Sequence, residues 1–228
     1  TVTIGGNATS ANAASSERSR SRLKAWSGRK SRVNELARLS VPTSASSGTC
    51  PCSLWTASTV PSIASVTSAT AIEIGVKFRA TTNGFISGVR FYKGTANTVA
   101  RRIGKFEEAT GGTLLQSATF TAETASGWQQ VTFATPVAVT ANTTYVASYY
   151  APYGRYSENQ GYFATSGTTR GPLDAPSSAA AAGNGVYRYG SSGFPTDTFS
   201  ASNYWVDVVF TTTGGPVVDT TPPSVTAT

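Results

Sequence analysis

Short runs of alternating apolar and polar residues constrain the fold of this chain more than any other feature of its sequence. In residues 71–78 (AIEIGVKF), the apolar residues Ile72, Ile74, Val76 and Phe78 alternate with polar or small residues. A period of two places alternate side chains on opposite faces and is typical of a half-buried β-strand. A helix would instead repeat its apolar residues every three or four positions.

Further strands are predicted along the rest of the chain, separated by turn-forming dipeptides such as Asn-Gly and Gly-Gly. They cover residues 85–93, 113–121, 128–133, 143–150, 185–190 and 203–212. In the last segment, we expect Tyr204, Val206, Val208 and Phe210 to face the core. Trp205 and Asp207 would then point to the opposite face.

Many short strands without a long helical pattern predict an all-β fold, an antiparallel β-sandwich of the jelly-roll kind. Charged residues make up only 13% of the chain, and Ser, Thr, Ala and Gly replace them. That share is about half the usual one, and the composition is typical of secreted or surface β modules. We therefore expect an extracellular or cell-surface location. No stretch approaches the roughly 20 apolar residues that a membrane helix needs.

The chain is predicted to have three parts. Residues 1–49 form an N-terminal arm or linker, residues 50–213 form the β-sandwich domain, and residues 214–228 form a second linker. The last part contains the sequence DTTPPSV, which is typical of the opening strand of a following domain.

The excess of positive charge lies in the arm. Residues 17–38 contain eight of the 18 Lys and Arg residues but only two of the 11 acidic residues. Leu23, Trp26 and Val33 could share one face of a short amphipathic helix there. A solvated segment is the plain interpretation, and contact with an anionic wall polymer or a neighbouring subunit is the functional one. Nucleic acid is not the expected partner, because the basic residues lie outside the predicted fold.

Several classes of catalysis are excluded by the absence of histidine. Neither His-based acid–base chemistry nor a Ser-His or Cys-His nucleophile pair can form. Glu107 and Glu108 are adjacent, and neighbours on a strand point to opposite faces, so they are a poor pair for glycoside hydrolysis. Glu123 with Asp207 stays open as another pair. We expect a chain that is not an enzyme.

No cofactor is predicted. A structural calcium site is a weaker hypothesis, because oxygen ligands suit Ca²⁺. Its ligands would be Asp174, Asp197, Asp207 and loop carbonyls, but no Asp-x-Asp spacing supports it.

Cys50 and Cys52 are the only cysteines and lie just before the first predicted strand. A secreted chain oxidises such a pair readily, so we expect a small disulfide at the entry to the domain. Thiols that cross-link two chains are the alternative. Metal binding is a weaker hypothesis still, because two thiolates leave a tetrahedral zinc site half empty.

Aromatic and amide side chains gather between residues 149 and 163. The plain interpretation is a core with a Tyr-rich loop covering a sheet edge. The functional one is a sugar platform, on which rings stack against a pyranose while polar groups bind its hydroxyls. The candidate binding residues are Tyr153, Arg155, Tyr156, Glu158 and Asn159, followed by Trp205 and Asp207.

Six segments together carry a family likeness. They are CPCSLW (50–55), IEIGVKFRATTNGFISGVRFYKG (72–94), ASGWQQVTFATPVAVTANTTYVASYYAPYGRY (125–156), GPLDAP (171–176), AGNGVYRYG (182–190) and SGFPTDTFSASNYWVDVVF (192–210). The chain thereby resembles the bacterial domain of unknown function 4082 family. The resemblance implies a place in large secreted bacterial proteins, often beside immunoglobulin-like modules, so residues 214–228 would begin one. It implies no catalytic residues.

The chain departs from that family pattern in two places. The family usually has histidines where this sequence reads NTVARRIGKFEEATGG (97–112) and Gly154-Arg155-Tyr156. Any role of those histidines is therefore lost here or is taken over by arginine.

Two functions follow from these features. The first is a non-catalytic module that attaches a larger secreted bacterial protein to a polysaccharide or cell-surface glycan. The second is a structural module of a surface stalk or filament, in which the N-terminal arm contacts neighbouring copies or domains of the same protein.

Overall fold

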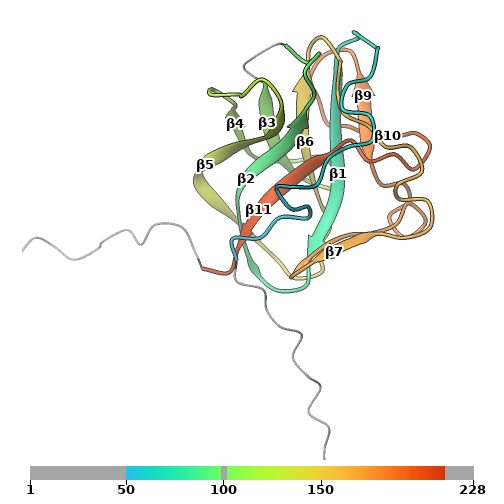
Figure 1. Cartoon of the computed structure of the whole chain (residues 1–228). Helices are drawn as coiled ribbons and strands as arrows, with labels where there is room; N and C mark the ends of the chain where they lie inside the picture. The colour runs from blue at the N-terminus through green and yellow to red at the C-terminus, as the bar shows by residue number, and fades with distance from the viewer. Residues whose placement is uncertain (1–49, 99–101, 214–228) are drawn as a thin grey trace, which may run out of the picture. The chain divides into compact units, whose positions relative to one another are not determined.

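The computed structural model describes residues 50–98 and 102–213, and the regular structure in them is entirely β (Figure 1). These residues contain no helix that could cross a membrane. The strands are β1 (Ile72–Ala80), β2 (Gly84–Lys93), β3 (Ile103–Glu108), β4 (Leu114–Thr119), β5 (Gly127–Val139), β6 (Tyr145–Ala151), β7 (Thr168–Arg170), β8 (Leu173–Ala175), β9 (Val186–Tyr189), β10 (Asp197–Thr198) and β11 (Val206–Thr211).

The strands form two antiparallel sheets of unequal size. The larger sheet has the order β10-β9-β1-β6-β3-β4, with β8 paired to β1 and β7 paired to β8. The smaller sheet has the order β11-β2-β5. In Figure 1, β9 and β10 lie on the side of the domain opposite β4 and β5. This arrangement confirms the predicted all-β sandwich.

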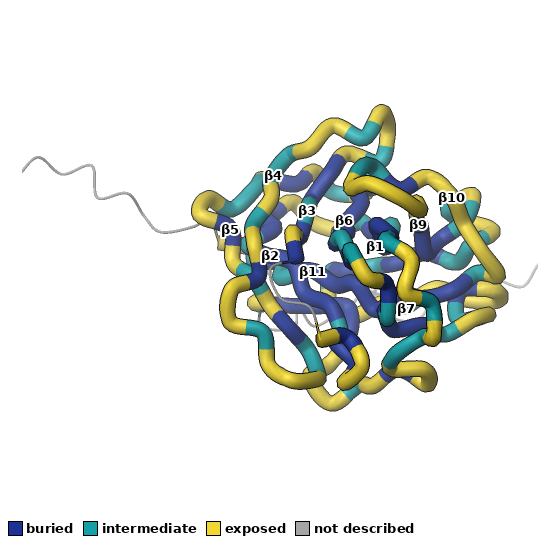
Figure 2. Tube along the Cα trace, turned by 90° about the horizontal axis from the view of Figure 1, so that it is seen from above, coloured by how far each residue is buried: buried dark blue, intermediate teal, exposed yellow. Residues whose placement is uncertain are grey.

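The core lies between the two sheets and follows the alternation of the strands. Ile72, Ile74, Val76 and Phe78 of β1 are all buried, as their spacing predicts. Aromatic rings link the layers, since Phe91 of β2 stacks on Tyr149 of β6 with 4.2 Å between ring centroids. Figure 2 shows buried residues along β11 and the neighbouring strands and exposed residues in the peripheral loops.

Strand β11 differs from the prediction on its outer face. Val206, Val208 and Phe210 are buried as expected, but Trp205 and Asp207 are buried too. The expectation that these two residues are accessible to a ligand is therefore wrong. The reason is a long-range one: the segment that precedes β1 crosses this face of the smaller sheet and covers it.

Asp207 fixes that covering segment. Its carboxylate accepts hydrogen bonds from the backbone N–H groups of Leu54 (2.8 Å) and Trp55 (3.2 Å). Arg90 of β2 forms an ion pair with the same carboxylate at 3.5 Å. Burial raises the pKa of Asp207 to about 6, and Arg90 and the backbone N–H groups limit the rise. One acidic side chain thus joins β11, β2 and the covering segment.

A cluster of aromatic rings completes the covered face. The Trp55 ring lies 5.5 Å from that of Trp205 and 6.3 Å from that of Trp128. Trp55 Nε1 donates a hydrogen bond to the Tyr162 hydroxyl at 2.8 Å. The Arg90 guanidinium lies over the Trp128 ring, 4.6 Å from its centroid. The tryptophans therefore hold the covering segment in place and are not a surface platform.

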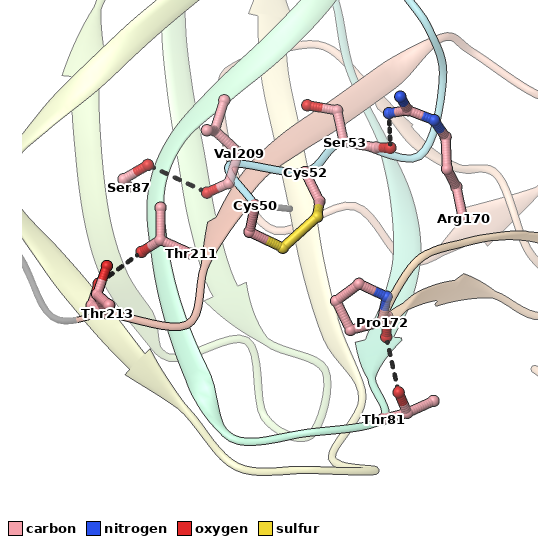
Figure 3. Close-up of a disulfide and its surroundings, with 10 residues drawn as sticks. All are labelled: Cys50, Cys52, Ser53, Thr81, Ser87, Arg170, Pro172, Val209, Thr211 and Thr213. Atoms are coloured by element: carbon pink, nitrogen blue, oxygen red, sulfur yellow. Dashed lines mark hydrogen bonds between the residues drawn. A yellow bond between two sulfur atoms is a disulfide. The ribbon is translucent and has the colours of Figure 1, made fainter. Parts of the chain in front are cut away.

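A disulfide between Cys50 and Cys52 lies at the start of the covering segment, beside β11 (Figure 3). Cys52 and Phe210 exchange two backbone hydrogen bonds of 2.8 Å each. Arg170 donates a further hydrogen bond to the Ser53 carbonyl oxygen at 2.8 Å. These contacts attach the first residues of the domain to β11 and to the β7–β8 hairpin.

All seven segments expected to form strands do so, and four strands were not expected. The latter are β3, β7, β8 and β10. The predicted arm of residues 1–49 with its basic segment 17–38, and the linker of residues 214–228, lie outside the described residues.

Removing the Asp207 carboxylate should destabilise the domain strongly. Asp207→Ala leaves Arg90 and the backbone N–H groups of Leu54, Trp55 and Val208 buried without their acceptor. We therefore expect the free energy of unfolding to fall by about 3–5 kcal/mol. Chemical denaturation measures the change. The control is Asp174→Ala, which breaks the partly exposed ion pair with Arg79 and should cost about 1 kcal/mol or less. Equal losses in the two variants would contradict the assigned role of Asp207.

Candidate functional site

A cavity of about 370 Å³ opens beside β9, near the β10 edge of the larger sheet. There the larger sheet extends beyond the three strands of the smaller one. Tyr187 and Tyr189 of β9 lie opposite Ile74 and Ile72 of β1. Because paired residues share a face, both tyrosines lie on the core-facing side of the sheet. The loops around residues 156–160 and 199–204 form the other walls.

Five aromatic side chains line this cavity, which we call the tyrosine pocket. They are Tyr156, Tyr187, Tyr189, Phe199 and Tyr204. Tyr204 meets both Tyr156 and Tyr187 edge to face, with centroid distances of 5.7 and 6.3 Å. Tyr156 and Tyr204 are buried and form the floor, whereas Tyr189 and Phe199 are exposed and form the rim. The cavity volume lies within the range of small-ligand sites, roughly 300–1,000 Å³.

One acidic residue, Glu158, lies in the wall of the tyrosine pocket. Its backbone N–H donates to the carbonyl oxygen of Ile63 at 2.9 Å, which ties it to the covering segment. Its carboxylate accepts a hydrogen bond from the Ser202 hydroxyl at 2.9 Å and a weak one from the Gln160 amide at 3.5 Å. No Lys or Arg of the described residues forms an ion pair with Glu158.

The phenol groups on the floor of the pocket are held in their neutral form. Burial raises the pKa of Tyr156, and neighbouring Tyr189 and the Glu158 charge raise it further. Burial also raises the pKa of Tyr204, again with a contribution from Glu158. The pocket therefore presents neutral hydroxyl groups and ring surfaces beside a carboxylate.

A tight turn divides the residues that the sequence suggested for one site. Gly154 and Arg155 both adopt positive φ angles, 58° and 56°. A Cβ at Gly154 would lie 2.5 Å from the carbonyl oxygen of Ser68, so this close approach requires glycine. Before the turn Tyr153 is exposed, and after it Tyr156 is buried. Tyr153 and Arg155 line a separate, more open hollow of about 560 Å³ together with Asn97.

Asn159 serves the fold and does not line the tyrosine pocket. Its side-chain oxygen accepts hydrogen bonds from the Trp205 indole N–H (2.9 Å) and the Ser62 backbone N–H (2.8 Å). The Trp205 indole is thereby satisfied inside the protein. Of the seven predicted binding residues, only Tyr156 and Glu158 meet in the pocket.

The remaining pocket residues were missed by the sequence analysis. They are Ile72, Gln160, Tyr187, Tyr189, Phe199 and Tyr204. A usable signal existed for Tyr187 and Tyr189, because alternation in the segment 185–190 places them on one face. Tyr187 and Tyr189 are distant from Glu158 in the sequence, so the sequence alone did not indicate that they lie near it in the fold.

A second group of buried polar residues lies on the outer face of the larger sheet. Glu73 accepts hydrogen bonds from Lys105 (3.0 Å), Ser148 (2.9 Å) and Ser192 (2.8 Å). Ser148 also contacts Glu107 at 3.3 Å. Burial raises the pKa of Glu107 to about 7, Lys105 lowers it and the Glu73 charge raises it.

The other suggested acidic groups have separate surroundings. Glu107 is buried and Glu108 is exposed, in keeping with opposite faces of one strand. Glu123 forms ion pairs with Arg102 and with Lys93. Asp207 forms its ion pair with Arg90.

The suggested calcium ligands do not come together as a group. Asp174 pairs with Arg79, Asp207 is enclosed by its own partners, and Asp197 is exposed. Within residues 50–98 and 102–213, no three His, Cys, Asp or Glu side chains form a group that could hold a metal ion.

The molecule is thus an antiparallel β-sandwich with an aromatic pocket at one sheet edge. Residues 58–206 match the model of the family described as Domain of unknown function (DUF4082), and the chain belongs to this family. Among curated proteins the chain has no match.

The raised pKa of Glu107 predicts a pH-dependent stability. Because the folded state favours the protonated carboxyl, its contribution is present below about pH 4.5 and is lost as the pH rises through about 7. Glu107→Gln should remove this loss and make the protein more stable than wild type at about pH 8, by roughly 1–2 kcal/mol. Urea unfolding at about pH 5 and 8 measures it. Exposed Glu108→Gln is the control and should leave the wild-type pH dependence unchanged; an identical effect of both variants would contradict the prediction.

Proposed function

We propose that this domain is a non-catalytic, carbohydrate-binding module of a larger secreted bacterial protein, and that the tyrosine pocket is its binding site. The observation that carries the proposal is the convergence of five aromatic rings with Glu158 and Gln160 around one cavity. Ring faces suit the apolar face of a pyranose, and carboxylate and amide groups suit its hydroxyls.

The presence of a single carboxylate in the wall of the pocket favours binding over hydrolysis. Glycoside hydrolysis by the usual route requires two carboxylates on opposite sides of the bond. The pocket wall contains one carboxylate, that of Glu158. Glu73 and Glu107 lie on the outer face of the larger sheet, where they are buried and engaged by Ser148.

The extracellular location is part of the same proposal. The disulfide between Cys50 and Cys52 supports it, because disulfides persist in oxidising compartments. The low share of charged residues, 13%, is a second supporting feature.

Truncating the rim of the tyrosine pocket should weaken retention on the polysaccharide. The experiment incubates the full chain with a panel of insoluble polysaccharides and measures the protein left in solution. We expect the double variant Tyr189→Ala with Phe199→Ala to lose about tenfold or more in affinity for the retained polysaccharide, since each ring contributes about 1 kcal/mol of stacking.

The matched control for this experiment is Tyr153→Ala. Tyr153 is 63% exposed, compared with 50% for Tyr189 and 52% for Phe199, and it lies in the separate hollow. It should retain wild-type binding. Loss of binding with Tyr153→Ala but not with the rim variant would move the site to that hollow, and no retention on any polysaccharide would contradict the function.

A further inference from the structure

The charge of the tyrosine pocket is unbalanced. Three other acids with buried side chains each have a basic partner: Glu73 pairs with Lys105, Glu123 with Lys93, and Asp207 with Arg90. Glu107 is also buried and has no ion pair among the described residues, but it contacts Ser148 on the outer face of the larger sheet and does not line the tyrosine pocket. Glu158 is also buried, but it has no such partner among the described residues. Its hydrogen bonds come only from neutral groups, Ser202 and Gln160.

The rest of the lining adds negative potential and no positive charge. None of the residues around the cavity is a Lys or Arg. The faces of aromatic rings carry partial negative charge and attract cations within about 6 Å of the ring centre. The burial that raises the pKa of Tyr156 and Tyr204 keeps both phenols neutral, so neither adds a charge of its own.

We propose that the tyrosine pocket is a subsite for a substituted ammonium group, and that the polysaccharide it binds carries protonated amino sugars. The inference rests on the proposed carbohydrate-binding function and names its substrate class. A cavity of about 370 Å³ has room for one sugar-sized group at a time. The ammonium group would supply a counter-ion to the Glu158 carboxylate.

Each part of the pocket has a role in this arrangement. Glu158 forms the ion pair with the ammonium group, and a charge-assisted hydrogen bond is roughly twice as strong as a neutral one. The rings of Tyr189 and Phe199 at the rim contact the cation and the sugar face. The exposed Gln160 amide is positioned to bind a hydroxyl beside the amino group. A neutral sugar would leave the charge of Glu158 without a counter-ion.

The first test compares matched ligands on the unaltered full chain. Calorimetry at about pH 6, where an aliphatic amine is protonated, measures binding of β-1,4-linked glucosamine oligomers and of the N-acetylglucosamine oligomers of equal length. We expect the amino oligomers to bind about tenfold more tightly. Added salt should reduce the preference, because an ion pair at a partly open site is screened.

The second test uses variants of the pocket. Glu158→Gln keeps the size of the side chain but removes its charge, so the preference for amino over acetylated oligomers should disappear. Tyr189→Leu and Phe199→Leu keep apolar volume at the exposed rim and remove the ring, so they should reduce the preference without unfolding the protein. Exposed Glu108→Gln is the matched control for loss of one negative charge and should leave the preference unchanged.

Choline chloride is the third ligand and separates the two proposals. Equal or tighter binding of the acetylated oligomers would overturn the ammonium subsite and leave carbohydrate binding intact. If choline binds and neither oligosaccharide does, the ammonium subsite would be supported and its assignment to amino sugars would be overturned. Absence of binding to all three ligands would overturn the ammonium subsite, and the polysaccharide panel decides carbohydrate binding separately. A preference that survives Glu158→Gln would also overturn the subsite.

Discussion

The buried carboxylate of Asp207 is the interaction on which the arrangement of the domain depends. It holds the segment before β1 on the outer face of the smaller sheet through the N–H groups of Leu54 and Trp55. That segment continues to Ile63, whose carbonyl oxygen accepts from the backbone of Glu158. Asn159 adds a second clamp through Ser62 and the Trp205 indole. The wall of the tyrosine pocket is therefore positioned by contacts that begin at β11.

The pocket itself follows from the mismatch between the two sheets. Three strands cannot cover the inner face of the larger sheet, so loops must cover it near β9. Tyr187 and Tyr189 are inner-face residues by register, and the loop residues Tyr204 and Phe199 approach them from the opposite side. The cavity does not interrupt the sandwich core, because it lies over the part of the larger sheet that the smaller sheet leaves uncovered. Under the proposed function, the sandwich core therefore carries the fold, while β9 and the loops beside it line the binding site.

Local pattern was sufficient to predict the strands whose side chains alternate strongly, such as β1 and β11. It failed for β3, where Gly104 and two consecutive acids give a weak signal and pairing with β6 and β4 decides the structure. The accessibility of Trp205 and Asp207 could not be predicted from β11 alone, because the segment that covers them is about 150 residues away in sequence. Of the site, Tyr156 and Glu158 were found because they are neighbours. Tyr189 was not, because only the fold brings it to them.

The surroundings of the buried acids separate those that hold the fold together from the one that borders the tyrosine pocket. A buried carboxylate destabilises the folded state unless hydrogen bonds or a base compensate its charge. Asp207 and Glu73 receive both kinds of partner and lie within the structure. Glu158 receives only neutral donors and borders a cavity. Hydrogen bonds and a basic side chain compensate the charges of Asp207 and Glu73, whereas hydrogen bonds alone compensate the charge of Glu158. Because a ligand cation can supply what the chain does not, the electrostatic cost of Glu158 becomes a source of binding free energy under the proposed function.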